Sequence, residues 1–519
     1  MESKIVSKNY KDMEKSPHKN LYLLLLSVLV GLVAGLVASL YRLSLEYAEG
    51  FGLSIYHFLA GHLIYLPLLL LAILILSAII SFLMTRYPMS SGSGIPQVKG
   101  QLLGYFKQNW FTTAFSKFIA GSLAMLGGLS LGREGPSVQL GAAMGEMVAG
   151  RWAKTERHRR LLIASGASAG LSAAFNAPLS GLMFTLEEVF KYFSPLILLT
   201  SLASAMAADF VSRLIFSGEA VFHFNILGAI PLQDYWLLVL LGLILGLFGA
   251  FYNRVLLASQ SLMNKIHWPY LRVLLSFLVV ASTALVFPMV VGSGHRLMDQ
   301  LSLGLGIGFL ALIFVLKFLI SMVSYASGIP GGIFFPLLVL GASLGSIFAS
   351  LAISSLHLPA YLFANFVILA MAGTFTAIVR APLTGILLLV EMTGSFNHLL
   401  PLAFVSLIAY VMADLLKSQP IYDSLLSRMI ASQEEDARVA DGQMMFETIL
   451  EFGAIADQKR IAELSLPEGC LIVGLHRSGR DIIPQGSSQL QAGDYLTFLI
   501  KKEDEVASRR AIRQIFTAH

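Results

Sequence analysis

The chain contains two related copies of one glycine-rich stretch, and this repeat is the strongest indication of its fold. The first copy is Gly128-Leu-Ser-Leu-Gly-Arg-Glu-Gly-Pro-Ser-Val-Gln-Leu-Gly-Ala-Ala-Met-Gly145. The second copy is Gly328-Ile-Pro-Gly-Gly-Ile-Phe-Phe-Pro-Leu-Leu-Val-Leu-Gly-Ala-Ser-Leu-Gly345. Glycines, a proline, a leucine and an alanine recur in the two copies at a constant offset. In a very apolar chain, glycine-rich breaks at matching places in two halves are typical of a transporter built from internal repeats, and they point to its substrate site.

The repeat extends beyond this pair. Ala177-Pro-Leu-Ser-Gly-Leu-Met-Phe-Thr-Leu-Glu187 matches Ala381-Pro-Leu-Thr-Gly-Ile-Leu-Leu-Leu-Val-Glu391. These identities leave open whether the halves run parallel or inverted. Glu187 recurs as Glu391, which favours an architectural role, whereas Glu188 faces Met392 and is the better functional candidate. The alternative for Glu188 is an interfacial acid at a helix end.

The composition indicates a membrane protein. Of 519 residues, 56% are hydrophobic and only 13% are charged, and the mean hydropathy is +0.73. Such values exclude a soluble protein of ordinary make-up. Several apolar stretches approach or exceed the length of a membrane-spanning helix, at residues 21–40, 63–83, 236–251, 273–291, 303–323, 335–353 and 400–412. We therefore expect an all-α polytopic membrane body.

Basic residues near the spans predict the orientation. Lysines precede the first apolar stretch, at Lys4, Lys8, Lys11, Lys15 and Lys19. The segment 151–160 is also strongly basic. We expect the amino terminus and this segment to be cytoplasmic. The formal net charge of +5 is thus a topology signal and does not indicate nucleic-acid binding. The first twenty residues are too polar for a signal peptide.

Three regions follow from the pattern. Residues 1–20 form a polar tail, residues 21–430 form the membrane body with halves of about 21–220 and 221–430, and residues 431–519 form a soluble α+β module. In this module we expect strands at 470–476 and 494–500 and helices at 458–464 and 502–515. Nothing in it has a catalytic pattern, and the single Cys470 excludes an internal disulfide or a cysteine-cluster metal site.

Three glycine-rich breaks are each followed by proline: Gly92–Pro96, Gly132–Pro136 and Gly332–Pro336. Proline suits the first turn of a helix, where its missing N–H costs nothing. Each break therefore predicts a helix amino terminus inside the membrane, whose unpaired N–H groups suit a buried anion. The alternative is that these glycines serve only close helix packing.

Glu134 is the strongest candidate for a functional residue. An acidic side chain within an anion-attracting break is costly unless it has a function. Its carboxylate can occupy the anion position and leave when protonated, which would make it a gate and a proton carrier. The alternative is a salt bridge with Arg133 or simple placement at a helix start. Ser93 and Tyr422 are weaker candidates, as hydroxyl donors to an anion.

Four motifs together resemble the CLC family of chloride channels and chloride/proton exchangers: Gly92-Ser-Gly-Ile-Pro96, Gly132-Arg-Glu-Gly-Pro136, Gly332-Ile-Phe-Phe-Pro336 and Gln419-Pro-Ile-Tyr422. The resemblance covers nearly all of residues 21–430. It implies that the hydroxyls of Ser93 and Tyr422 and the N–H groups of Ile333 and Phe334 bind chloride. It also implies that Glu134 is the external gate and that Glu188 is the internal proton-transfer residue.

The family fold would be two inverted halves per subunit, with broken helices meeting at the membrane midplane and one pore per subunit of a homodimer. No cofactor is implied. Ser93 argues against the fluoride-exporting and nitrate-preferring branches, where this position differs. The stretch 466–494 resembles the carboxy-terminal TrkA-C subdomain of potassium-conductance regulators. This tail indicates a prokaryotic plasma-membrane protein with a cytoplasmic carboxy terminus, in which the module binds a small ligand or helps the subunits dimerise.

Chloride/proton exchange is the leading functional hypothesis, and a passive chloride channel of the same fold is its nearest rival. A potassium channel is disfavoured because no Thr-Val-Gly-Tyr-Gly filter occurs and helix amino termini repel cations. An intramembrane hydrolase is disfavoured because no His-Glu-x-x-His motif or convincing serine, histidine and acid set occurs within the spans. We therefore expect a transporter and not an enzyme.

Overall fold

The computed structural model describes residues 17–191, 193–216, 228, 230–437, 443–477, 480–501 and 504–517. Most of the polar tail, including Lys4, Lys8, Lys11 and Lys15, lies outside these residues. The described residues form two compact units. The larger, called here the membrane unit, contains residues 19–99 and 108–423, and the smaller contains residues 100–107 and those from 424 onward.

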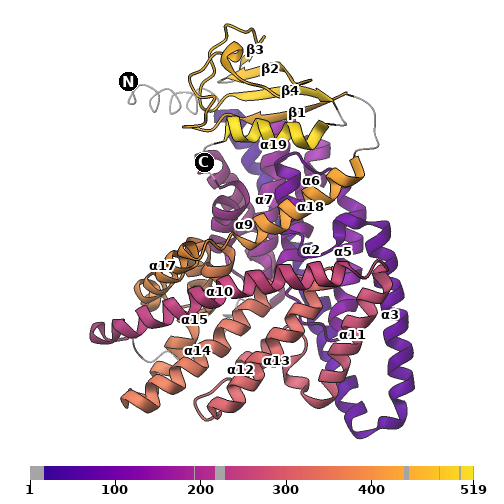
Figure 1. Ribbon diagram of the computed structural model, residues 1–519, viewed down its shortest axis with the longest axis vertical. Coiled ribbons are helices and arrows are strands. Elements are labelled where there is room, and N and C mark those ends of the chain that lie inside the picture. The colour runs from indigo at the N-terminus through magenta and orange to yellow at the C-terminus, as the bar shows by residue number, and fades with distance from the viewer. Residues whose placement is uncertain are drawn as a thin grey trace. The chain divides into compact units, whose positions relative to one another are not determined.

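The membrane unit is helical. Its first half contains α2 (Pro17–Gly61), α3 (Leu66–Arg86), α4 (Ile95–Leu102), α5 (Trp110–Leu126), α6 (Glu134–Trp152), α7 (Glu156–Phe175), α8 (Pro178–Phe184) and α9 (Pro195–Phe216). Its second half contains α10 (Tyr235–Asn264), α11 (Pro269–Val286), α12 (His295–Gln300), α13 (Ile307–Ala326), α14 (Phe334–Leu356), α15 (Leu362–Val379), α16 (Pro382–Thr393), α17 (Leu399–Leu415) and the start of α18 (Ile421–Ala437). In Figure 1, α10 crosses obliquely over α13 and α15.

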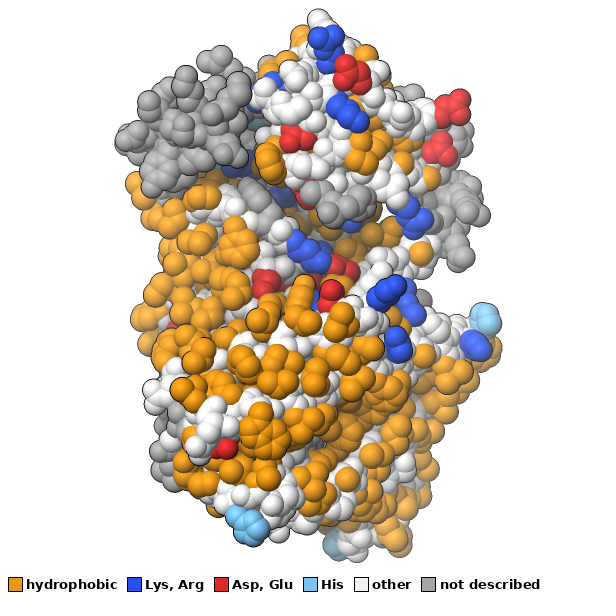
Figure 2. Space-filling model, turned by 60° about the vertical axis from the view of Figure 1, so that its left-hand side comes forward, with side chains coloured by type: hydrophobic (Ala, Val, Ile, Leu, Met, Phe, Trp, Pro, Cys, Tyr) orange, Lys and Arg blue, Asp and Glu red, His pale blue; other side chains and the backbone are white. Residues whose placement is uncertain are grey.

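Among the described residues, nine helices are long and apolar enough to cross a membrane. Each of the seven predicted apolar stretches coincides with one of these helices for most of its length, which confirms the spans. The stretch 273–291 continues past the helix end at Val286, and 303–323 begins before the helix start at Ile307. The composition did not mark α9 and α15 as spans, and both belong to the nine. Hydrophobic side chains cover the visible face of the membrane unit almost without interruption (Figure 2). An apolar surface of this extent is suited to lipid and not to water.

The three predicted helix starts are confirmed. α4 begins at Ile95, α6 at Glu134 and α14 at Phe334, each one or two residues before its proline. Positive φ angles precede these helices, for example +101° at Gly94, where a side chain would be strained.

The two halves are inverted repeats. Gly132 and its counterpart Gly332 form an isolated antiparallel bridge. A second pair of backbone hydrogen bonds has the same symmetry. The N–H of Gly92 donates to the carbonyl of Gly328, and the N–H of its counterpart Gly292 donates to the carbonyl of Gly128, both at 2.8 Å. Equivalent residues that bond reciprocally indicate a local two-fold axis between the halves. The inverted repeats that the family resemblance implies are related by such an axis, lying in the membrane plane.

Small residues bring α6 and α7 into close contact. A Cβ added at Gly141 would lie 2.1 Å from the carbonyl oxygen of Gly166, and one added at Gly145 would lie 2.3 Å from that of Leu162. Backbones that approach this closely are typical of membrane helix pairs. The packing role of glycine, weighed above as an alternative, thus applies to these two positions, whereas other glycines of the same motif form the break.

The smaller unit contains a four-stranded sheet of order β1-β4-β2-β3 and the helix α19 (Glu505–Phe516). The strands are β1 (Gln443–Ile449), β2 (Leu471–Arg477), β3 (Arg480–Ile482) and β4 (Tyr495–Lys501), and the paired strands are antiparallel. The predictions of strands at 470–476 and 494–500 are confirmed, and α19 confirms the helix predicted at 502–515. Its buried core includes Phe446, Leu496, Phe498 and Phe516.

The predicted helix at 458–464 is wrong. Gln458 has a φ of +63°, and only the single 3-10 turn Ile461–Glu463 forms. The reason is a long-range pairing: the N–H of Gln458 donates to the carbonyl of Leu490, and the N–H of Leu490 donates to the carbonyl of Lys459. These backbone groups are thus not available for a helix.

Candidate anion and proton site

Two helix amino termini meet at the repeated break. The N–H of Gly132 donates to the carbonyl of Gly332 at 2.6 Å, and the reverse bond is 2.7 Å long. α6 and α14 each begin two residues later, at Glu134 and Phe334. The first N–H groups of a helix have no partner within it. The bridge therefore places two donor-rich, partly positive helix ends beside each other.

Glu134 points from one of these ends to the other. Its side chain is fully buried. Oε2 accepts a hydrogen bond of 3.3 Å from the N–H of Phe335 in the first turn of α14. Within the described residues, Oε1 has no hydrogen-bond partner. The carboxylate thus lies at the start of the opposite half's helix, among backbone donors of the kind that suit an anion.

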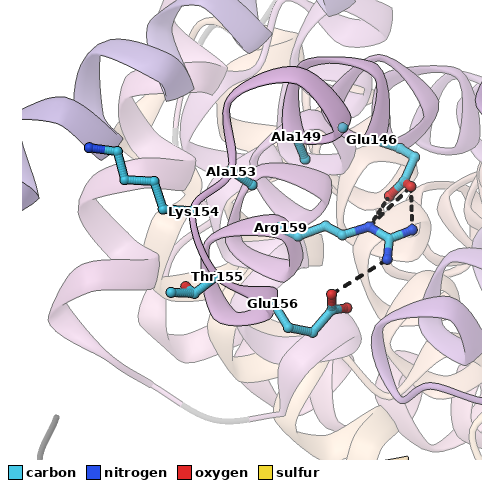
Figure 3. Close-up of a pocket in the computed structure, with 8 residues that line it drawn as sticks. Glu146, Ala149, Ala153, Lys154, Thr155, Glu156 and Arg159 are labelled. Carbon is cyan, nitrogen blue, oxygen red and sulfur yellow. Dashed lines mark hydrogen bonds and ion pairs between the residues drawn. The ribbon is translucent and has the colours of Figure 1, made fainter.

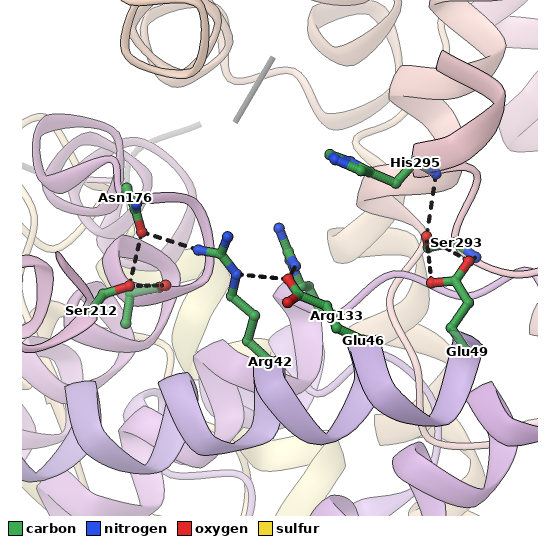
Figure 4. Close-up of polar contacts among 9 residues, drawn as sticks. Arg42, Glu46, Glu49, Arg133, Asn176, Ser212, Ser293 and His295 are labelled. Carbon is green, nitrogen blue, oxygen red and sulfur yellow. Dashed lines mark hydrogen bonds and ion pairs between the residues drawn. The ribbon is translucent and has the colours of Figure 1, made fainter. Parts of the chain in front are cut away.

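The alternative of a salt bridge between Glu134 and Arg133 is not what the structure contains. Arg133 Nη1 pairs with Glu46 Oε1 at 2.8 Å, and Arg42 Nε pairs with the same oxygen at 3.0 Å. Figure 4 shows both guanidinium groups directed at Glu46. The side chain of Arg133 is thereby directed to a different acid.

Ser93 and Tyr422 bring two hydroxyl groups into the protein interior. Ser93 is 2% exposed and Tyr422 is fully buried. Neither hydroxyl has a partner among the described residues, which is costly for a buried polar group. The Ser93 hydroxyl lies against α6, since a Cβ added at Gly135 would be 2.4 Å from its Oγ. It therefore lies beside the residue that follows Glu134.

Ile333 and Phe334 lie at the start of α14. Ile333 is its N-cap residue, Phe334 is its first residue, and both side chains are buried. The Phe334 ring packs against Phe375 and Phe175, with centroids 4.6 and 5.3 Å apart. This packing fixes the helix start and leaves its backbone N–H groups as donors.

Glu188 lies in the π-helical segment Thr185–Phe190 (η3), which continues directly from α8. Such turns occur frequently at functional sites. Its side chain is 2% exposed and accepts a bond of 2.9 Å from Lys99 Nζ. Lys99 also pairs with Asp423, the residue after Tyr422, and Asp423 pairs with Lys191. No sequence pattern singled out Lys99, Asp423 or Lys191.

Glu187 and Glu391 cap helices of the opposite half, which confirms their architectural role. Glu187 accepts from the N–H groups of Leu383 and Thr384 at 3.1 and 2.8 Å and from the Thr384 hydroxyl at 2.8 Å. Glu391 accepts the equivalent bonds from Leu179 and Ser180, at 2.9, 2.8 and 2.5 Å. Each carboxylate thus neutralises the amino terminus of α16 or α8.

The comparisons with known proteins address the whole arrangement. A family model described as "Voltage gated chloride channel" matches residues 76–414, and one described as "TrkA-C domain" matches residues 445–510. The chain belongs to the CLC family. The H(+)/Cl(-) exchange transporter ClcA of Vibrio cholerae serotype O1 is 36% identical over 448 residues, which are 83% of this chain and 94% of that protein.

Solved structures of CLC proteins are also similar. A slow cyanobacterial Cl-/H+ antiporter has a TM-score of 0.73 at 29% identity and covers 79% of this chain and 98% of its own. A CLC-type fluoride/proton antiporter has a TM-score of 0.65 at 25% identity and covers 78% and 97%. The carboxy-terminal sheet unit of this CLC protein is a TrkA-C domain.

The CLC repeat contains a third element that sequence reasoning missed. Pro288-Met-Val-Val-Gly-Ser-Gly294 repeats Pro88-Met-Ser-Ser-Gly-Ser-Gly94, so Ser293 is the counterpart of Ser93. The Ser293 hydroxyl does not lie open, because it bonds both Glu49 carboxylate oxygens at 2.9 and 3.0 Å, as Figure 4 shows. The signal was available at the same offset of 200 residues that relates the other breaks.

Two buried lysines also obey the repeat. Lys117 Nζ donates to the carbonyls of Ser90 and Gly92, at 2.9 and 2.6 Å. Its counterpart Lys317 donates to the carbonyls of Val290 and Gly292, at 3.1 and 2.8 Å. Because both halves have this arrangement, we assign the two lysines a structural role: each one stabilises the backbone of a break by binding its carbonyl groups.

A pocket at the other end of α6 is separate from this site. It is lined by Glu146, Ala149, Gly150, Ala153, Lys154, Thr155, Glu156 and Arg159 (Figure 3). Glu146 lies twelve residues after Glu134, or about 18 Å along the helix. Arg159 pairs with both Glu146 and Glu156, and Lys154 lies over the Tyr22 ring. Its charged groups thus already have protein partners, and we place no part of an ion pathway there.

Proposed function

We propose that this chain is a secondary active chloride/proton antiporter. The named activities of two relatives support this, since both are described as exchangers of chloride and protons. The observation that carries the proposal is the Glu134 carboxylate, which reaches the start of α14 and leaves one oxygen without a partner among the described residues. A passive chloride channel of the same fold is the alternative, and the buried acid Glu188 favours exchange over it.

Glu134 would act as the external gate and as a proton carrier. While ionised, its carboxylate competes with chloride for the donors at the start of α14. Protonation removes the charge that those donors attract, so the side chain leaves and a chloride ion takes its place. Each exchange of carboxylate for chloride therefore links the movement of one ion to a proton-transfer step.

Chloride would be held by dipoles without a full positive charge. The buried hydroxyls of Ser93 and Tyr422 and the N–H groups of Ile333 and Phe334 would be its donors. Binding by dipoles is strong enough for entry but weak enough for release. Glu188 would pass protons between Glu134 and the internal solution.

The remaining expectations belong to the same proposal. The chain would be a homodimer in a bacterial plasma membrane, with both termini in the cytoplasm, and the relatives named as bacterial proteins support this location. The TrkA-C domain would be a cytoplasmic regulatory module that binds a small ligand or contributes to dimerisation.

The test uses the purified full chain in liposomes. With a chloride gradient imposed across the vesicle membrane, we expect protons to move against their own gradient. Glu134→Gln should abolish this uphill proton movement while chloride still passes. Glu156→Gln is the matched control, since Glu156 is an exposed acid at the start of α7, and it should behave like the wild type.

One outcome would overturn the proposed exchange, and another would overturn the role of Glu134 in it. Chloride flux without proton movement in the wild type would make the protein a passive channel. Retained coupling in Glu134→Gln would leave exchange in place but remove Glu134 from its role as the proton-carrying gate.

A further inference from the structure

Glu188 belongs to a buried chain of alternating charges. Lys99 Nζ lies 2.9 Å from Glu188 Oε1, and the two side chains are only 5% and 2% exposed. Lys99 also pairs with Asp423, and Asp423 pairs with Lys191, whose side chains are 31% and 46% exposed. The charges therefore run from the interior at Glu188 to solvent at Lys191.

We propose that Lys99 is a positioning residue for proton transfer: its ammonium holds the Glu188 carboxylate in a buried ion pair, so that proton entry requires this pair to open. The inference rests on the role proposed above for Glu188. It goes beyond that role because it names the group that sets how readily the internal acid takes up a proton.

The position of Lys99 makes it more than a counter-ion. Lys99 lies on α4, six residues after Ser93, and Asp423 lies on α18 directly after Tyr422. The pair between them therefore joins α4, which begins two residues after Ser93, to α18, which carries Tyr422. When Glu188 becomes neutral, Lys99 loses one of its two acidic partners. The proton state of Glu188 is thereby linked to the elements of the chloride site.

Three charged side chains act on the Glu188 carboxylate among the described residues. The charges that act on its carboxylate belong to Lys99 on α4, Asp423 on α18 and Lys191 at the end of its own segment. The Tyr422 hydroxyl is also within reach of the Glu188 charge. Of these groups, Lys99 is the cation in direct contact with the carboxylate. An opposite charge in contact with a carboxylate favours its ionised form by about one to three pH units.

The direction of the expected effect follows from this charge. Without Lys99, the negative form of Glu188 loses its partner and faces Asp423, a like charge. Both changes favour the neutral form. Lys99→Met should therefore raise the pH at which Glu188 is half-protonated by about one to three units. Lys99→Arg keeps the charge and should shift this pH only slightly.

The measurement is an infrared difference titration of the full protein in lipid, because it observes the carboxyl group without requiring transport. The band of Glu188 is assigned by its absence in Glu188→Gln. Lys191→Met is the matched comparison: Lys191 pairs with Asp423 and acts on Glu188 without direct contact, so its loss should move the midpoint in the same direction but by less than Lys99→Met. If Lys99→Met fails to fold, Lys99→Gln removes the charge while it retains a hydrogen-bond donor.

The result that overturns the inference is an unchanged Glu188 midpoint in a folded Lys99→Met or Lys99→Gln variant. Proton flux as a function of internal pH, measured in the same variants, should shift in the same direction as the infrared midpoint. A failure of the proposed exchange is distinguishable, because it appears as absent proton movement in the wild type. A shifted midpoint with unshifted proton flux would also overturn the role of Lys99 in proton transfer.

Discussion

The two halves of the membrane unit share a hydrogen-bonded framework and differ in their acids. Gly132 and Gly332 bond each other, Glu187 and Glu391 cap each other's helices, and Lys117 and Lys317 hold equivalent carbonyls. These contacts cross or repeat between the halves and require the same residue in both. A repeated charge in this protein is therefore part of the architecture.

Two buried acids have no acidic residue at the equivalent position of the other half. Glu134 corresponds to Phe334, and Glu188 corresponds to Met392. Glu134 accepts one bond at the start of the opposite half's helix, and Glu188 lies in a buried ion pair. Neither has the three bonds from a helix start that Glu187 has. If the roles proposed for Glu134 and Glu188 are right, a departure from the repeat is a better guide to transport chemistry than the presence of a buried charge.

We expect the largest loss of stability at the close contact between α6 and α7. Gly141 on α6 faces Gly166 on α7, whereas its counterpart Gly341 faces Ala370. A Cβ at Gly141 would lie 2.1 Å from a carbonyl oxygen, but one at Gly341 would lie 2.9 Å from its nearest atoms. We expect Gly141→Ala to cost about 3 kcal/mol or more and Gly341→Ala about 1 kcal/mol. Thermal stability of the purified protein in detergent measures the difference.

Gly150→Ala is the control for helix propensity in the same α6. A Cβ there meets nothing within 4 Å, so this change should be neutral or slightly stabilising. Equal losses in Gly141→Ala and Gly341→Ala would mean that the two halves pack alike and that the distances above do not control stability.

The next effect separates architecture from chemistry. Glu187→Gln and Glu391→Gln each weaken three bonds from a helix start, and we expect each to cost about 1.5–3 kcal/mol of stability. Both variants should retain proton coupling. Glu188→Gln should show the opposite pattern, with coupling lost and stability changed less. Thermal stability and proton flux in liposomes are measured on all three variants.

A folded Glu187→Gln or Glu391→Gln variant without proton coupling would contradict this division. Very different losses of stability in Glu187→Gln and Glu391→Gln would also contradict it, since the contacts of the two carboxylates are nearly identical. The comparison predicts similar losses from the two capping residues because they perform one role twice.

Much of this site could be predicted from the sequence, because its signals are local. The glycine breaks, the prolines and the repeat offset predicted where α4, α6 and α14 begin. The difference between Glu187 and Glu188 followed from one comparison with Glu391 and Met392. In each case a short pattern carries a backbone requirement, either a positive φ or a helix start.

The rest could not be predicted because it depends on contacts between distant segments. Lys99 meets Asp423 across more than 300 residues, and no local pattern assigns a partner to a lone lysine. The helix expected at 458–464 failed for the same reason, since Leu490 takes its backbone bonds. Ser293 is different: its signal was present in the repeat, but only the structure revealed that Glu49 occupies its hydroxyl.

The smallest effect compares the two serines of the repeated Gly-Ser-Gly break. The Ser93 hydroxyl has no partner among the described residues, whereas the Ser293 hydroxyl is bonded to Glu49. If the proposed chloride site is right, Ser93→Ala should weaken chloride binding by about 0.5–1.5 kcal/mol, or roughly two- to tenfold. Ser293→Ala should leave chloride affinity nearly unchanged, because its hydroxyl serves Glu49. Calorimetric titration of chloride into the purified protein measures both affinities.

This pair also tests why inverted halves need not bind two anions. At Ser293 the protein supplies its own carboxylate, so the donors of the break are already occupied. Among the described residues no carboxylate bonds the Ser93 hydroxyl, so this donor would remain for chloride in the proposed site. Equal weakening by the two substitutions would show that the second break also takes part in chloride binding. A change in Ser293→Ala alone would transfer the binding site to the other half and remove Ser93 from it.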